Sequence, residues 1–502
     1  MARLTILPLL ALLPLAPLHA QSEITEARIR AHIETLASDA YEGRLPGTRG
    51  EAMAVEYIAR HMAQYGLAPA VGGESYYQPV ALVERLPGEG RVSWQHDGER
   101  VAIAPGDVVL LGREPVEAIG EARMIFGGYG EDLDEEGGGR LGAMDLDGAV
   151  VFLFNALPPT QDAPSLADRR SRLAERGVAA VIGLTAPDDD WPAISAYARA
   201  RGRNSLVSAR MAGIEGLLSP QASALLLALG GLTPEAAPSV AAAHEFRPIE
   251  LDYSFDARAT TRLRPFTGYN VAGRIEGAAD SDETVLVMAH HDHLGICAPE
   301  SATDRICNGA VDNASGVAAL LEVARVLARG DPPVRDILFV ATTAEEMGLL
   351  GARALVEDPI VAIEDIVAAI NLDTIAVAPA GASVAIIGRG MTPLDPVVDS
   401  VATALGRSIN PSDEANAFIQ RQDGWELTRA GVPSIMAGGS FSDMSLLGGF
   451  LGGAYHAAED DLAHPIELGG ATEDARLHVA LVRAIADPAR YANPRSGEGY
   501  GQ

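Results

Sequence analysis

The segment TVLVMAHHDH, residues 284–293, places a run of apolar and β-branched residues directly before a polar cluster. A short run of this kind predicts a buried β-strand. The polar cluster His290–His293 then falls at the carboxyl end of that strand. Ligands of open parallel sheets bind in the crevice outside the carboxyl ends of the strands. The segment therefore predicts an α/β fold with ligand-binding residues at one end of the sheet.

Acidic residues recur at the ends of further segments. Asp312 lies in GAVDNASG, residues 309–316, ahead of an apolar pattern at helical spacing. Two more strand-like runs end in Glu345-Glu346 and in Asp373. Any one of these residues could be a helix cap or part of a solvated helix start. Because all of them follow buried runs or enter helices, we expect them to converge.

The residue types in these segments fit a site for two metal ions. Imidazole and carboxylate groups suit zinc, and a pair of ions about 3.5–4 Å apart needs a bridging carboxylate. One histidine, from a Gly-led polar loop late in the chain, completes the candidate ligands, which are His290, Asp312, Glu346, Asp373 and His456. Of the adjacent glutamates 345 and 346, one can bind metal while the other serves as general base.

Composition limits the function further. The chain has 502 residues, 48% of them hydrophobic, which predicts two or three domains with at least one large core. A net charge of -30 argues against nucleic acid as a partner. Arg3, the apolar run Leu4–Leu18 and a cut after Ala20 predict a secretory signal peptide. We therefore expect a periplasmic or secreted protein that has no membrane partner after signal cleavage.

Cys297 and Cys307 are the only two cysteines. In an oxidising compartment they can form a disulfide, and zinc ligation is the alternative. We favour the disulfide because it would brace the loop between the histidine cluster and Asp312. On the entropy model, such a short loop gains roughly 2–3 kcal/mol of stability.

The chain alternates between helical and strand-rich segments, which predicts an inserted domain. Two amphipathic helical patterns come first, and strand–helix alternation resumes only after residue 250. The segment between them has apolar runs separated by Gly-rich or acidic loops, with no His/Asp/Glu cluster at metal-ligand spacing. The predicted parts are a signal peptide (1–20), an N-terminal part of the main domain (21–95), a β-rich insert (96–246), a catalytic part (247–490) and a disordered tail (491–502).

Five motifs, in this order, resemble those of the co-catalytic di-zinc aminopeptidases, a family that includes glutamate carboxypeptidase II and the transferrin receptor. They are AHHDHLG (289–295), GAVDNASG (309–316), AEEMGL (344–349), NLD (371–373) and YH (455–456). The insert around FGGYG, residues 126–130, resembles the family's protease-associated domain. The resemblance implies a zinc exopeptidase-like fold: a mixed, largely parallel sheet with helices on both faces, interrupted by that domain.

The resemblance also implies a cofactor of two zinc ions bridged by Asp312. His290 and Asp373 would bind one ion, and Glu346 and His456 would bind the other.

Three further roles follow from the same resemblance. Glu345 would be the general base. Asp292 would orient the ligand His290 without binding metal itself. Tyr455 would donate a hydrogen bond to the oxyanion.

The walls of the substrate pocket are less well defined by the motifs. The resemblance places His291 and His293 in the pocket wall. The segment RQDGW, residues 421–425, departs from the family, which commonly has Ser and then Asp-His, so Gln422 and Gly424 leave the substrate side undefined.

The expected function is zinc-dependent hydrolysis of N-terminal peptide bonds, with a water activated by two zinc ions and a glutamate base. A carboxypeptidase or dipeptidase is an alternative, and Arg421 or Arg389 could then bind a free carboxylate. Glutaminyl cyclase is another. A non-catalytic, receptor-like binding protein would be expected to have lost ligands, whereas all five are present. The sequence predicts neither the preferred side chain nor the oligomeric state.

Overall fold

The computed structural model describes residues 23–130, 133, 141–156 and 165–494. The chain forms two compact units, one from residues 1–79 and 268–502 and the other from Val80 to Thr267. The predicted signal peptide and most of the predicted tail lie outside the described residues. No helix in the described part of the chain is long and apolar enough to cross a membrane.

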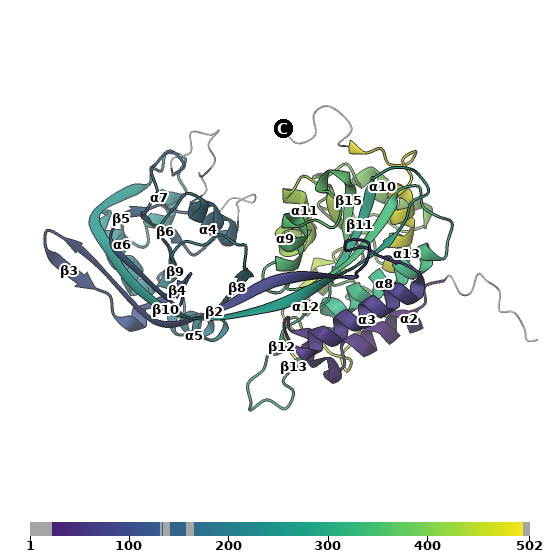
Figure 1. Ribbon diagram of the computed structural model, residues 1–502, viewed down its shortest axis with the longest axis horizontal. Helices are drawn as coiled ribbons and strands as arrows, with labels where there is room; N and C mark the ends of the chain where they lie inside the picture. Colours follow the sequence, from purple (N-terminus) through teal and green to yellow (C-terminus); the bar gives the residue numbers. More distant parts are fainter. Residues whose placement is uncertain (1–22, 131–132, 134–140, 157–164, 495–502) are drawn as a thin grey trace, which may run out of the picture. The chain divides into compact units, whose positions relative to one another are not determined.

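The first unit is built on a mixed, largely parallel sheet (Figure 1). Parallel pairing joins the neighbouring strands β17, β15, β11 and β14, and antiparallel strands flank them on both sides. In sheet order the strands are β16 (Ala385–Ile387), β17 (Ser434–Gly438), β15 (Ile366–Asn371), β11 (Thr284–His290), β14 (Asp336–Thr342) and the end of β10 (Ile249–Ile275). The predicted fold class is confirmed.

Helices cover both faces of this sheet, as the apolar pattern of β11 requires. Its alternate residues Val285 and Val287 share a core with α2 (Glu26–Leu36), α3 (Arg49–Tyr65), α8 (Ser315–Ala328) and α13 (Leu468–Ile485). Leu286 and Met288 point to the opposite face and pack with α9 (Leu350–Glu357) and α11 (Gly424–Arg429). Because both faces are buried, all seven residues of β11 are buried.

The second predicted N-terminal helix, α3, begins and ends at its capping residues. Thr48 caps α3 by accepting a hydrogen bond from the backbone of Glu51, and Gly66 ends the helix in the left-handed conformation. The predicted apolar face, which includes Ile58 and Met62, is fully buried.

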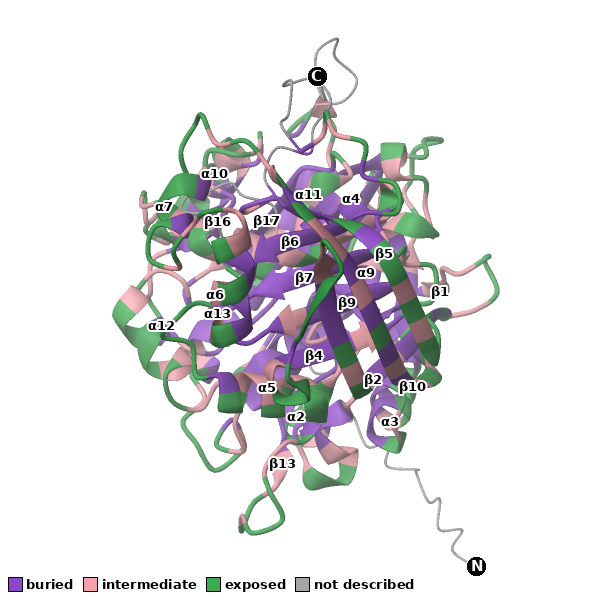
Figure 2. Cartoon of the chain, turned by 90° about the vertical axis from the view of Figure 1, so that its left-hand side faces the viewer, coloured by how far each residue is buried: buried purple, intermediate pink, exposed green. Residues whose placement is uncertain are grey.

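The second unit has its own hydrophobic core. Within this unit the first part of β10 pairs antiparallel with β5, and the next three strands follow in parallel. The sheet strands are β5 (Val116–Phe126), β6 (Val150–Phe154), β7 (Ala180–Leu184), β9 (Ile214–Leu218) and β4 (Val108–Gly112). The central strands β6, β7 and β9 are buried, whereas β2 and β10 alternate between buried and exposed residues (Figure 2).

The insert extends beyond the limits expected from sequence, 96–246. The compact unit runs from Val80 to Thr267 because the long strands β2 (Tyr77–His96) and β10 belong to it over most of their length. Both strands continue across the unit boundary, so composition does not change there. The chain also stays packed beyond the expected start of the tail at 491, since Tyr491 is buried and its carbonyl accepts a hydrogen bond from Arg335.

The disulfide Cys297–Cys307 is present, with the two Cα atoms 5.7 Å apart. It joins the two short strands β12 (Gly295–Ile296) and β13 (Ile306–Cys307), which pair antiparallel. The expected brace between the histidine cluster and Asp312 is confirmed.

Candidate metal centre

Three candidate ligands meet at the carboxyl ends of the parallel strands. His290 ends β11, Asp373 follows β15, and Asp312 lies in the turn that leads into α8. The Nε2 atom of His290 is 3.2 Å from Oδ1 of Asp312 and 3.6 Å from Oδ1 of Asp373. These three side chains form one compact ligand group.

A second group of candidate ligands lies next to Oδ2, the other carboxylate oxygen of Asp312. The Nε2 atom of His456 is 3.4 Å from Oδ2 of Asp312 and 2.9 Å from Oε2 of Glu346. The two oxygens of Asp312 therefore face two different groups. This is the arrangement that a bridging carboxylate needs.

The backbone around Asp312 is fixed by neighbouring polar side chains. Asp460 accepts hydrogen bonds from the backbone N–H groups of Val311, at 2.8 Å, and Asp312, at 2.9 Å. The Asn313 amide donates to the carbonyl of Leu372, one residue before Asp373. These contacts link the positions of the two candidate ligands.

Asp292 is fully buried and holds the turn that carries the two glutamates. Its carboxylate accepts from the backbone N–H of Glu345 at 3.1 Å and of Glu346 at 3.4 Å. The Nδ1 atom of His290 lies 3.2 Å from the backbone carbonyl of Asp292 and 3.7 Å from its carboxylate. Asp292 is thus placed to orient both His290 and the glutamate pair.

His293 is not the pocket-wall residue expected from sequence. It is fully buried, and its Nδ1 atom is 2.7 Å from Oε1 of Glu346, inside the carboxylate cluster. His291 is also fully buried, with Nε2 3.0 Å from the carbonyl of Tyr269, and it faces away from solvent. The two histidines were expected in the pocket wall because their partners, Glu346 and Tyr269, are distant in sequence and only the fold brings them close.

The segment that departs from the family motif turns inward. Gln422 is buried and its side chain accepts from the backbone N–H of Gly424 at 2.8 Å. Asp423 is fully buried and accepts a hydrogen bond from the Thr342 hydroxyl. Sequence reasoning did not single out Asp423, although it lies between Gln422 and Gly424.

Tyr455 lies beside the ligand group. Its ring stacks on His456, with 3.7 Å between centroids, and its hydroxyl is 3.4 Å from Nη2 of Arg421. The hydroxyl is therefore near the site and held by a cation. Its expected role as oxyanion donor remains a prediction.

A buried arginine to which sequence reasoning gave no role supports the loops of the site. The Arg44 guanidinium is fully buried and donates hydrogen bonds to four backbone carbonyls, those of Leu36, His291, Asn308 and Gly309. It therefore ties the N-terminal helix to both the histidine cluster and the Asp312 loop.

The site is unusually rich in carboxylates for a buried region. Burial raises the pKa of Glu345 well above its usual value, with Glu346 adding to the shift against the opposing charge of His290. Burial likewise raises the pKa of Asp423 to about 7. For Asp312, burial is outweighed by hydrogen bonds from His290 and His456, which hold its pKa well below its usual range.

The donor set fits divalent metal. Buried carboxylates need a compensating cation, and the carboxylates of Asp312, Glu345, Glu346 and Asp373 outnumber the imidazoles beside them. The ligand atoms of His290, Asp312 and Asp373 lie within 4.8 Å of one another, and so do those of His293, Asp312 and Glu346, with imidazole nitrogen and carboxylate oxygen in each set. This combination suits zinc.

Comparison with known proteins agrees with the site. Residues 270–482 match the model of peptidase family M28. A probable zinc metalloprotease of Pyrenophora teres f. teres is 38% identical over 105 residues, which cover 21% of this chain and 22% of that protein. Aminopeptidase NAALADL1 of Mus musculus is 36% identical over 118 residues, 22% of this chain and 14% of that protein. The chain thus spans about a fifth or less of the length of these relatives.

A solved structure extends the comparison to both units. The aminopeptidase from Aneurinibacillus sp. strain AM-1 is 18% identical, covers 93% of this chain and 95% of its own, and has a TM-score of 0.50, which shows a shared fold. The fold is similar to that of this aminopeptidase, and the sequence matches are to zinc peptidases and aminopeptidases. The match of residues 270–482 to peptidase family M28 agrees with the resemblance of the sequence motifs to co-catalytic zinc aminopeptidases.

Proposed function

We propose that the protein is an exported aminopeptidase that hydrolyses N-terminal peptide bonds with two zinc ions and a glutamate base. The observation that carries the proposal is the Asp312 carboxylate, whose two oxygens face separate ligand groups beside the partly buried Glu345. The predicted signal peptide and the disulfide support export. We also propose that the unit Val80–Thr267 is a protease-associated domain.

The residues assigned to metal are those expected from sequence. His290 and Asp373 would hold one zinc ion, Glu346 and His456 the other, and Asp312 both. Bound zinc would polarise the substrate carbonyl and make water acidic enough to lose a proton near neutral pH.

The chain's own residues supply the remaining chemistry. Glu345 takes the proton of the attacking water and returns it to the leaving amine, and its raised pKa suits a base that must also act as an acid. Asp292 holds the backbone of Glu345 in place. Tyr455 donates a hydrogen bond to the oxygen on which negative charge develops.

An aminopeptidase is favoured over a carboxypeptidase because one candidate carboxylate-binding arginine is already engaged. Arg389 forms an ion pair with Asp399 at 2.9 Å and lies 4.0 Å from Asp395. Arg421 is left as the alternative, beside the Tyr455 hydroxyl.

A substrate screen on the purified exported protein tests the proposal. Amino-acid amides and free-N-terminal peptides should be cleaved, whereas N-acetylated peptides should not. Cleavage of the blocked peptides would establish the carboxypeptidase alternative. Cyclisation of N-terminal glutamine without peptide cleavage would establish the cyclase, and inactivity with all of these substrates in the zinc-loaded protein would favour a binding protein.

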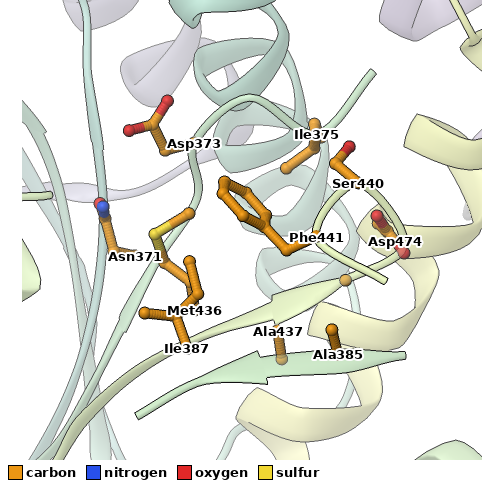
Figure 3. Close-up of a pocket in the computed structure, with 11 residues that line it drawn as sticks. Asn371, Asp373, Ile375, Ala385, Ile387, Met436, Ala437, Ser440, Phe441 and Asp474 are labelled. Carbon is orange, nitrogen blue, oxygen red and sulfur yellow. The ribbon is translucent and has the colours of Figure 1, made fainter. Parts of the chain in front are cut away.

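A small, largely apolar cavity, lined in part by Asp373, suggests which N-terminal side chain the enzyme accepts. Ile375, Ile387, Met436 and Phe441 line it, and Phe441 lies between the other labelled side chains (Figure 3). Its volume of about 10 Å³ has room for about one water molecule. We propose that it receives the N-terminal side chain, so glycine and alanine should be preferred.

Phe441→Ala should enlarge this cavity and shift the preference toward leucine. We expect the ratio of kcat/KM for leucinamide over alaninamide to rise roughly 10-fold or more, because methylene groups that fit an apolar pocket are each worth that much. Phe418 packs on Phe441 with 5.6 Å between ring centroids but does not line the cavity, so Phe418→Ala is the matched control. A wild-type preference for leucine, or equal shifts in both variants, would contradict this assignment.

A further inference from the structure

We propose that the second unit, Val80–Thr267, contains a binding pocket for the free α-carboxylate of a peptide whose last residue is apolar. The pocket is a cavity of about 300 Å³ between β4, β9, α4 (Leu166–Glu175) and the turn from α5 (Trp191–Arg201) to β8 (Arg203–Leu206). All of its lining residues belong to this unit. The proposal is independent of the metal centre and of the peptidase activity.

The pocket carries an excess positive charge. Glu215, in the central strand β9, is 2% exposed and forms an ion pair with Arg203. The Nε atom of Arg170 lies 3.9 Å from the same carboxylate. Among the lining residues two guanidinium groups therefore face one carboxylate, so the lining itself carries a net positive charge. A largely buried charge without a full partner favours binding of an anion.

Arg170 is the group with donors available for such an anion. Its side chain is 16% exposed, and its buried Nε atom has no hydrogen-bond partner among the described residues. Its contact with Glu215 is longer than a hydrogen bond. Burial lowers the pKa of Arg170 only to about 10, so it remains charged at neutral pH. A guanidinium fork matches the two oxygens of a carboxylate.

The rest of the lining indicates what the carboxylate is attached to. Val109, Leu111 and Leu217 form apolar walls on β4 and β9. The amide of Asn155, directly after β6, is the one neutral polar side chain of the lining and can pair with a peptide group. The volume lies at the lower end of the range of ligand pockets, which suits one or two residues. A C-terminal apolar residue supplies both the anion and the apolar surface.

Calorimetric titration of the full-length protein tests the proposal. The ligands are N-acetyl-alanyl-leucine, its C-terminal amide and free leucine, with chromatography confirming that each is intact afterwards. The free acid should bind saturably, and the amide should bind at least roughly 10-fold more weakly because it loses the charge-assisted hydrogen bonds. Free leucine should bind more weakly than the acetylated peptide, because its ammonium group faces a cationic pocket. Equal or tighter binding of leucine would assign the pocket to free amino acids and overturn the peptide assignment.

Variants locate the binding. Arg170→Gln should weaken binding of the acid roughly 10–100-fold, and Arg170→Lys should do so less, because it keeps the charge but loses the fork. Arg172→Gln, on the same helix but outside the lining, should leave binding unchanged. Thermal denaturation and zinc content establish that each variant is folded.

Three results would overturn the proposal: no saturable binding of the acid, equal binding of acid and amide, or undiminished binding by Arg170→Gln. The last would place the carboxylate elsewhere, including at the metal centre. If Arg170→Gln does not fold, the acid–amide comparison on the wild type and the Arg170→Lys variant decide the question.

Discussion

Glu345→Gln should lower kcat by roughly 10²–10⁴-fold while the protein keeps its full zinc content. Glutamine preserves the shape of the side chain and leaves no cavity, so folding should be unaffected. It cannot accept the proton of the attacking water. The backbone contact between residue 345 and Asp292 does not depend on the side chain and should remain.

Glu346→Gln is the matched control, because it makes the same chemical change one residue away. Glu346 is within 2.9 Å of His456 and 2.7 Å of His293, in the second ligand group, so its amide variant should lose zinc affinity. Zinc content and kcat of both variants should be measured in parallel. An active Glu345→Gln enzyme, or zinc loss in Glu345→Gln with retention in Glu346→Gln, would show that the two roles are misassigned.

The ligands at the strand ends were predictable because His290, Glu346 and Asp373 each follow a recognisable apolar run. β11, β14 and β15 are all parallel, so the polar residues that end these runs meet at one edge. The convergence of His290 and Asp373 follows from that topology, whereas Asp312 reaches them from the turn that leads into α8. Knowledge of the fold class was therefore enough to predict most of the site.

Residues whose positions depend on distant partners were not predictable. His293 contacts Glu346 53 residues away, and Arg44 donates to Gly309 265 residues away. In isolation each residue has a plausible local role, as a loop or wall residue. Arg44 meets its partner because the N-terminal helices pack against the histidine cluster. His293 meets its partner because the end of β14 packs there as well. The unit boundary at Val80 was missed for a related reason, since β2 crosses it as a continuous strand.

Replacement of Asp312 should have the largest effect on metal. Oδ1 of Asp312 lies 3.2 Å from Nε2 of His290, and Oδ2 lies 3.4 Å from Nε2 of His456. Asp312→Asn should therefore weaken zinc binding at both positions. Asp373 belongs to one ligand group, so Asp373→Ala should chiefly weaken one ion. Metal analysis should give two zinc ions for the wild type, about one for Asp373→Ala and fewer than one for Asp312→Asn.

Thermal unfolding provides a second measurement of the same claim. Metal that binds only the folded state raises its stability by RT ln(1 + [metal]/Kd), so zinc should raise the Tm of the wild type and much less that of Asp312→Asn. The neutral amide is a weak zinc ligand and cannot balance two ions. The chelated wild type and chelated Asp312→Asn should unfold at similar temperatures if the substitution acts through metal. A wild type with one tightly bound zinc ion, or an Asp312→Asn protein that retains both ions at full affinity, would rule out the bridging role, because an amide has a single carbonyl oxygen and cannot supply one oxygen to each ion.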